Sequence, residues 1–306
     1  MPRMSSSLTN PSIKADAAWK LVLDRWFHEF LLFFYPDIAS KINWTSPIEV
    51  LDQELLPLTT DSMVGKQLTD KLFKVHALDG RLCYIILHLE IQGDRETRFE
   101  VRLFEYSYKL YDRYRCPILT LAVLTDDSPH WRPSHYQAEV WGYKTHHFDF
   151  YPVKLLDYQE QADQLLATDN PFAVIVSIHL RSQTTRTQPR QRLHIKFAIF
   201  KRLLKQGWGR DAIRSFYTFM DGVMRLPEEL EIQYHHDIYQ LEKVKGVDYI
   251  TSAERFGIEK GMQQGMQQGT LKTRLVIARE MLARGFDIKL IKEVTHLSDE
   301  EFSALN

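Results

Sequence analysis

The stretch "LTDKLFKVHALDGRLCYIILHLEIQG", residues 68–93, constrains the fold more than any other part of this chain. It holds two apolar runs of strand length separated by an Asp-Gly pair, and such a pair between two apolar runs predicts a β-hairpin. Polar side chains stand at the ends of the runs: Asp70 opens the first, and Glu90 and Gln92 close the second. The sequence therefore raises one central question: why do carboxylates stand at the ends of strands that are apolar enough to be buried?

The flanking segments predict a sheet with helices around it. Apolar residues recur at steps of three and four within residues 16–41, which predicts a helix with a broad buried face that ends or bends at Pro36. Residues 48–56 fit either a strand or a short helix. Residues 98–114 carry a helical stripe, and the apolar run within 117–126 indicates a buried strand. This order predicts an α/β core with a mixed sheet flanked by helices.

The remaining chain is expected to be mainly helical. A strand or two is expected within residues 136–151, and helical periodicity dominates from Val153 onward. We therefore divide the chain into four parts: a flexible leader (1–15), an α/β core (16–152), a helical extension (153–245) and a C-terminal part (246–306) that holds a Gly/Gln repeat helix and a module of short helices.

The C-terminal part carries two local signals. The repeat "EKGMQQGMQQGT" fits either a polar helix of low stability, since each interior Gly costs about 1 kcal/mol, or a helix that mediates self-association. A homo-oligomer formed through this region is therefore one expectation. Further on, "LSDEEF" places Ser298 three residues before Glu301, a capping box that predicts a helix start. The pair of short helices has the size of a helix-turn-helix, but its charge is balanced and its end is acidic, so a small packing or oligomerisation module fits it at least as well.

Composition limits the environment and the partners. The formal net charge of −1 gives no bulk attraction to nucleic acid or to anionic lipid, so DNA contact would have to come from a local basic face. No apolar run approaches the roughly 20 residues of a membrane span, and residues 1–15 lack the apolar core of a secretory signal. The two cysteines, Cys83 and Cys116, fit reduced thiols better than a disulfide. We expect a cytoplasmic protein without a membrane partner.

The strand-end carboxylates suggest a metal-dependent nuclease. Phosphodiester hydrolysis of this kind needs carboxylates that hold a hard divalent cation. Asp70 and Glu90 on neighbouring strands can supply them, and Gln92, two residues after Glu90, leaves the same face of the strand. By spacing alone the signal is weak, because a glutamate at the end of a strand is usually solvated or paired.

A family resemblance strengthens this interpretation. The succession "VGKQLTDKLFKV", "GRLCYIILHLEIQG" and "RFEVRLFEYSYKLYDRY" resembles the Rpn family of recombination-promoting nucleases, whose members also carry a transposase label, within the PD-(D/E)XK nuclease superfamily. Further blocks, such as "AVLTDDSPHWRP" and "YITSAERFGIEKGMQQGMQQG", agree in order from about Trp19 to the C-terminus. The resemblance implies a restriction-endonuclease-like core, DNA as substrate, Mg²⁺ (or Mn²⁺) as cofactor and a role in recombination or in mobile elements.

The resemblance also assigns roles to single residues. Asp70 matches the superfamily's Asp, Glu90 matches its Glu, and Gln92 stands where the superfamily has Lys. A neutral amide can orient water or phosphate but cannot supply the positive charge of a lysine. Two lysines, Lys71 and Lys74, are candidates to replace that charge.

A third acidic ligand and the cations that contact DNA remain to be assigned. Glu54 is the first candidate for the additional metal ligand and Glu29 the second. Arg98 and Arg102, on or beside the helix after the acidic strand, are candidates for phosphate contact together with Lys71 and Lys74. Tryptophans such as Trp131, Trp141 and Trp208 are expected to pack in the core or at hinges rather than to stack on bases.

Two other functions fit the same residues. One is a catalytically weak or inactive scaffold that binds DNA or protein and oligomerises through its helical tail. The other is an RNA nuclease, because the carboxylate pair does not specify the sugar of the substrate.

Overall fold

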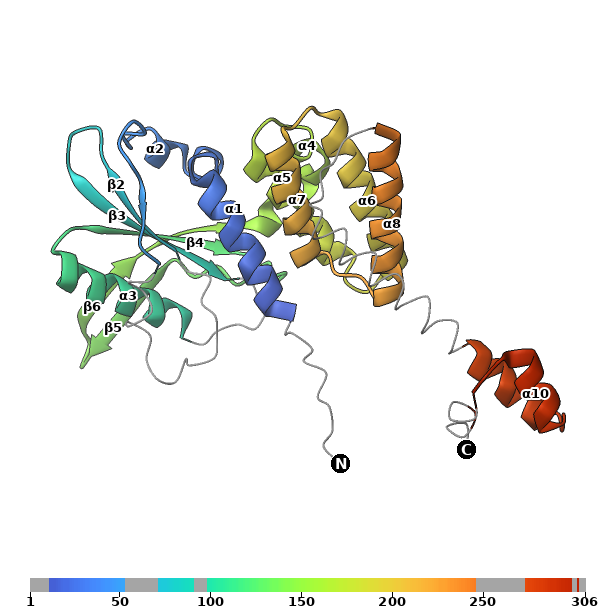
Figure 1. Ribbon diagram of the computed structural model, residues 1–306. Helices are drawn as coiled ribbons and strands as arrows, with labels where there is room; N and C mark the ends of the chain where they lie inside the picture. The colour runs from blue at the N-terminus through green and yellow to red at the C-terminus, as the bar shows by residue number, and fades with distance from the viewer. Residues whose placement is uncertain (1–10, 53–70, 91–97, 246–272, 299–301, 303–306) are drawn as a thin grey trace. The chain divides into compact units, whose positions relative to one another are not determined.

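The computed structural model describes residues 11–52, 71–90, 98–245, 273–298 and residue 302 (Figure 1). The chain forms two compact units, Met1–Arg225 and Leu226–Asn306. The division falls inside the predicted helical extension, and the first helix begins within the predicted leader, at Pro11.

The first unit contains the sheet and most of the helices. In chain order its elements are α1 (Pro11–Phe34), α2 (Pro36–Ala39), β1 (Glu49–Val50), β2 (Lys71–His76), β3 (Leu82–Glu90), α3 (Phe99–Tyr114), β4 (Ile118–Leu124), β5 (His135–Val140), β6 (Tyr143–Asp149), β7 (Tyr151–Lys154), the 3₁₀ helix η4 (Leu155–Gln161), α4 (Ala162–Leu165), α5 (Pro171–Thr184), α6 (Pro189–Lys205) and α7 (Arg210–Val223).

Five of these strands form one mixed sheet in the order β1-β2-β3-β4-β7. The pairs β1–β2 and β2–β3 are antiparallel, whereas β3–β4 and β4–β7 are parallel. The predicted α/β fold with a mixed sheet flanked by helices is therefore confirmed. So is the predicted hairpin: Gly80 in the β2–β3 turn has a φ of +84°, which glycine adopts without the steric cost of a side chain.

Helix α1 packs on two sides. On one side Phe27 stacks on Phe73 of β2 with ring centroids 3.7 Å apart. On the other side Trp19 contacts Phe172 of α5 and, edge-on, Phe219 of α7. Figure 1 shows α1 between the sheet and these helices. Because the first helix needs both partners to bury its aromatic side chains, the sheet and the helices after β7 form one compact unit.

Helix α3 covers the opposite face of the sheet. Its predicted stripe, Phe99, Leu103, Tyr106 and Leu110, is fully buried. The first half of the stripe packs with residues of β4, including Leu124, and the second half packs with residues of β2 and β3. The helical period of the sequence thus gave the buried face correctly.

Strands β5 and β6 form a separate two-stranded hairpin. Its base packs on α3, where Phe104 lies 4.9 Å from Tyr136 and 5.8 Å from Phe148 between ring centroids. Strand β7 then returns to the edge of the main sheet. One or two strands were expected within residues 136–151, and β5 and β6 correspond to them. The third strand, β7, continues to Lys154, so the start of the helical region was placed too early at Val153.

The second unit contains α8 (Glu228–Lys245), a helix over residues 273–283 and α10 (Ile288–Thr295). Asp287 caps α10 by accepting a hydrogen bond from the amide of Lys289 at 2.8 Å. The C-terminal helices share a small core made of Ala278, Ile291, Leu297 and Phe302. The Phe302 amide donates to the Ser298 carbonyl at 2.9 Å.

Among the described residues no helix is long and apolar enough to span a membrane. The Gly/Gln repeat lies outside the part of the chain that the structure describes.

The aromatic stack between α1 and β2 predicts a strong effect of truncation. Phe73→Ala should lower the free energy of unfolding by about 3–5 kcal/mol, because the ring is fully buried and its loss leaves a cavity. Urea denaturation followed by circular dichroism measures this loss. Leu32→Ala, which truncates a half-exposed side chain on α1, is the control and should stay within about 0.5 kcal/mol of the unchanged protein. Equal effects of the two substitutions would contradict the packing described above.

Candidate functional site

The C-terminal ends of the three parallel strands meet at one edge of the sheet, called here the carboxyl edge. In register across it stand Glu90 of β3, Leu124 of β4 and Lys154 of β7. Strand β2 runs antiparallel to β3 and starts at the same edge, where Lys71 pairs with Leu87. The two chain positions that were predicted to cooperate, the start of β2 and the end of β3, therefore belong to the same edge.

Several predicted site residues lie outside the described part of the chain. These are Asp70, which precedes the first residue of β2, Gln92, which follows the end of β3, and Glu54. Glu90 is described through its backbone, as the last residue of β3 and the register partner of Leu124. Their roles as metal ligands and catalytic groups remain predictions.

Lys71 occupies a buried ion-pair network. Its side chain is 2% exposed, and its ammonium group pairs with Asp24 of α1 and, at 2.5 Å, with Asp52 after β1. The second carboxylate oxygen of Asp52 accepts a hydrogen bond from the Leu72 amide at 3.1 Å. Two carboxylates thus already engage Lys71, and the arrangement serves to join α1, β1 and β2.

The other predicted cations differ in accessibility. Lys74 binds Glu49 at 2.7 Å, and this hydrogen bond raises the pKa of the Lys74 ammonium group. Arg98 is 64% exposed and pairs with Glu105 at 3.2 Å. Arg102 is buried, with its guanidinium carbon 5.7 Å from the centre of the Phe99 ring. Of the two arginines, Arg98 is the one that presents its charge to solvent.

Glu29, the second candidate for a third ligand, lies where α1 meets α5. Its backbone carbonyl accepts a hydrogen bond at 3.2 Å from the side-chain amide Nδ2 of Asn170, the residue that caps α5. Asn170 also accepts a hydrogen bond from the Phe172 amide at 2.8 Å, as an N-cap does.

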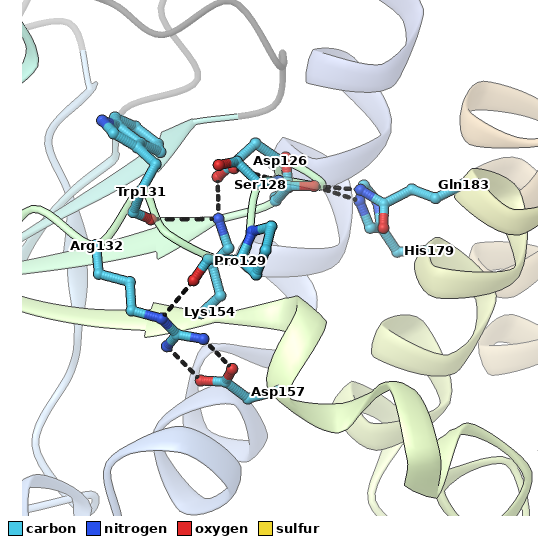
Figure 2. Close-up of polar contacts among 10 residues, drawn as sticks. Asp126, Ser128, Pro129, Trp131, Arg132, Lys154, Asp157, His179 and Gln183 are labelled. Atoms are coloured by element: carbon cyan, nitrogen blue, oxygen red, sulfur yellow. Dashed lines mark hydrogen bonds and ion pairs between the residues drawn. The ribbon is translucent and has the colours of Figure 1, made fainter.

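A polar network holds the loop that follows β4 at the carboxyl edge (Figure 2). Lys154 donates to Asp126 at 2.5 Å, and both side chains are buried. The other oxygen of Asp126 accepts the Ser128 amide at 2.9 Å. Lys154 also reaches the Trp131 carbonyl at 3.4 Å, and its ammonium nitrogen lies 5.7 Å from the centre of the Trp131 ring. The end of β7 is thereby tied to the loop from β4.

A second ion pair closes the same loop. Arg132 donates in bidentate fashion to Asp157 of η4, at 2.8 and 2.5 Å, while its Nε donates to the Pro129 carbonyl at 3.0 Å. The hydrogen bonds from Arg132 lower the pKa of the Asp157 carboxyl group. A small cavity of about 270 Å³ lies against Arg132, Lys154, Asp157 and Leu124, the register partner of Glu90.

Helix α5 anchors the first residue of the loop. The Thr125 carbonyl accepts from Gln183 and lies 3.4 Å from Nε2 of His179 (Figure 2). Because a carbonyl only accepts hydrogen bonds, Nε2 carries the proton and Nδ1 does not. Burial lowers the pKa of His179 to about 4, so the ring is neutral at pH 7.

The network supports the edge and holds no obvious reactive group. The charged donors that Figure 2 shows are already engaged, and the histidine is buried and neutral. Its chemical consequence is rigidity: three elements, β7, η4 and α5, fix the loop beside the end of β3. A rigid second layer of this kind is what positions reacting groups precisely.

Sequence reasoning did not find this network. Asp126 ends the predicted strand over 117–126, but its lysine partner lies 28 residues away in a segment read as the start of the helical region. Local periodicity contains no information on which distant lysine pairs with which carboxylate.

One comparison with known proteins gives a match. Residues 271–306 match the family model described as "Rpn/YhgA-like nuclease family, C-terminal HTH domain". This match supports assignment of the chain to the Rpn family, in agreement with the resemblance in sequence. It suggests a nuclease or DNA-binding protein. No curated protein and no solved structure matches the chain.

The buried Lys154–Asp126 pair predicts an asymmetric response to substitution. Lys154→Met should lower the free energy of unfolding by about 3–5 kcal/mol, because it leaves the buried carboxylate of Asp126 without its counter-charge. Adding Asp126→Asn should recover part of this loss. A double-mutant cycle by urea denaturation measures the coupling. As a control, Lys74→Met removes a solvent-accessible pair with Glu49 and should change stability little. A loss for Lys154→Met no larger than this control would argue against a tightly held pair.

The buried His179 predicts a pH dependence. His179 has a pKa of 6.5 in the unfolded chain and about 4 in the folded chain. At pH values between these two, the unfolded chain therefore binds more protons than the folded chain. Stability should therefore fall as pH drops through this range, with about 2 kcal/mol assignable to His179 at pH 5. Denaturation at pH 7 and pH 5 measures the change. It should be smaller in His179→Gln and unaltered in His146→Gln, which replaces an exposed histidine. The same pH dependence in all three proteins would refute the assignment.

Proposed function

We propose that this protein is a metal-dependent DNA endonuclease that hydrolyses phosphodiester bonds, with a role in DNA recombination or in mobile elements. The observation that carries the proposal is the strand arrangement at the carboxyl edge. The backbone of Glu90 ends β3 there, and β2 starts at the same edge immediately after Asp70 in the chain. The match of the C-terminal residues to the HTH domain of a nuclease family adds independent support.

The chemistry of the proposed donors suits a hard divalent cation. Asp70 and Glu90, with Glu54 as a third carboxylate, offer oxygen ligands of the kind that Mg²⁺ or Mn²⁺ binds. When bound, such an ion acidifies a coordinated water molecule and offsets the negative charge of the phosphate. The proposed role of these three carboxylates is to hold the ion at one edge of the sheet.

Gln92 takes a different role from the lysine that it replaces. Its amide can donate a hydrogen bond to phosphate and accept one from water, which orients both groups. It provides neither a positive charge nor a base, so turnover should be slower than with a lysine at this position.

Arg98 is the best placed of the predicted cations to contact the DNA backbone. It is 64% exposed and directly precedes Phe99, which packs in one cluster with Leu124. Leu124 is the register partner of Glu90, so the start of α3 lies at the carboxyl edge. Contacts of arginine with phosphate give affinity that does not depend on base sequence.

A second candidate function is a catalytically weak or inactive scaffold that binds DNA or protein and self-associates through its C-terminal region. The observation that favours it is the absence of the superfamily's lysine at Gln92. The engagement of Lys71 by two carboxylates strengthens it, because that lysine was one of the candidates to replace the missing charge.

A plasmid-nicking assay with Mg²⁺ or Mn²⁺ tests the proposal. Asp70→Ala and Glu90→Ala should each lower nicking at least about 100-fold, since each removes a metal-binding carboxylate, whereas Gln92→Ala should have a smaller effect of about 10-fold. The control is Asp112→Ala, which removes an exposed carboxylate at the far end of α3 and should leave nicking unchanged.

Each outcome of this assay has a distinct meaning. Nicking that survives both Asp70→Ala and Glu90→Ala would refute the assigned site. DNA retention without any nicking by the unchanged protein would favour the scaffold. Cleavage confined to a parallel RNA substrate would replace DNA by RNA in the proposal.

A further inference from the structure

The hairpin formed by β5 and β6 ends in an exposed aromatic tip. Trp141 is 94% exposed, and its neighbours Val140 and Tyr143 are 49% and 77% exposed. The expectation that Trp141 packs in the core or at a hinge was therefore wrong. A large apolar side chain held almost entirely in solvent gains nothing from burial, and with Val140 and Tyr143 beside it the tip is a candidate contact surface.

The backbone at the tip makes the tryptophan more unusual. Trp141 has a φ of +53° and Gly142 a φ of +83°, the combination found in two-residue hairpin turns of type I′. Asn-Gly is the favoured pair in this turn, whereas a bulky residue at positive φ is strained. The sequence thus places a tryptophan where both solvation and backbone conformation disfavour it, and such outliers concentrate at functional positions.

The base of the hairpin is well anchored. Phe104 of α3 packs against Tyr136 and Phe148 on one strand each, and its ring centroid lies 5.3 Å from that of His146. The Phe150 amide donates to the Ser134 carbonyl at 3.0 Å where the two strands leave the hairpin. Because the base of the hairpin is anchored, its tip is already ordered. Binding a partner that covers Trp141 therefore costs little conformational entropy in this loop.

We propose that Trp141 contacts DNA bases by entering between neighbouring base pairs of a duplex. A two-stranded ribbon has the width that a DNA groove admits, and apolar side chains inserted between base steps are an established way to grip a deformed duplex. Beside the turn, Glu139 stands opposite Lys144 in the strand register. The charges of these two residues sum to zero, so they give the tip no net negative charge that would repel phosphate. The HTH match supplies the reason to choose DNA among possible partners. The inference rests on the DNA-binding part of the proposed function and not on hydrolysis.

Trp141→Asn separates a DNA contact from a structural role. It creates the Asn-Gly pair that the turn prefers, so the melting temperature should stay the same or rise. Loss of one base–aromatic contact should nevertheless raise the Kd for a fluorescein-labelled duplex by about 5- to 150-fold. Binding is measured by fluorescence anisotropy with the full chain in EDTA, where no hydrolysis interferes. Trp141→Phe keeps an aromatic ring and should recover much of the affinity.

Leu78→Ala is the matched control. Leu78 is 68% exposed in the turn between β2 and β3, so this substitution removes an exposed apolar side chain from a different hairpin and should leave the Kd unchanged. Duplexes that contain 2-aminopurine add a direct readout, because the fluorescence of this base changes when it unstacks. That change should occur with the unchanged protein and be lost in Trp141→Asn.

Several results would overturn the inference. A Kd for Trp141→Asn within about twofold of the unchanged protein would do so, as would equal losses in Trp141→Asn and Leu78→Ala. Binding to phosphatidylglycerol vesicles that depends on Trp141, with DNA affinity unchanged, would assign the tip to a lipid surface. Failure of the unchanged protein to bind any DNA would overturn both this inference and the nuclease. DNA binding that depends on Trp141 without cleavage in Mg²⁺ would uphold the inference and refute the nuclease.

Discussion

The parallel pairing of β4 with β3 on one side and with β7 on the other determines what meets at the carboxyl edge. Antiparallel neighbours would send their C-terminal ends to opposite edges, whereas parallel pairing brings Glu90, Leu124 and Lys154 into one row. Parallel pairs require a crossover between the strands, and α3 supplies it for β3 and β4 while burying its stripe on the sheet. The same crossover places Arg98, which directly precedes α3, at the carboxyl edge. The chemistry proposed here thus depends on strand direction before it depends on any single side chain.

Strand direction alone does not make an edge rigid, and the loop after β4 shows how rigidity is added. Asp126 and Lys154 are both buried, a position that is stable only because each satisfies the other and the loop backbone supplies further partners. The Thr125 carbonyl is held from α5, and the far end of the loop is held by Arg132. Burying these charges gains little net stability, but it penalises any alternative loop conformation that would leave one of them unpaired. The network therefore favours one geometry beside the end of β3.

The features predicted correctly from sequence are those fixed by local pattern. The Asp-Gly turn, the stripe of α3 and the apolar run of β4 each depend on residues near one another in the chain, where hydrophobic period and turn preference act directly. The partners of Lys71 could not be found in this way. Asp24 and Asp52 are ordinary acidic positions in the sequence, and only the packing of α1 on β2 brings them to one ammonium group. A lysine next to the predicted site consequently looked available for substrate when it is engaged in the fold.

Trp141 was missed for the opposite reason. Composition predicts that tryptophan is buried, because its apolar area is large, and the Gly that follows it was not read as the second half of a hairpin turn. The type I′ turn prefers Asn at the position that Trp141 occupies. A conflict of this kind between turn preference and sequence indicates function more clearly than agreement does. The formal charge of −1 fits the proposed contact, because stacking on bases depends less on counterion release than contacts with phosphate do.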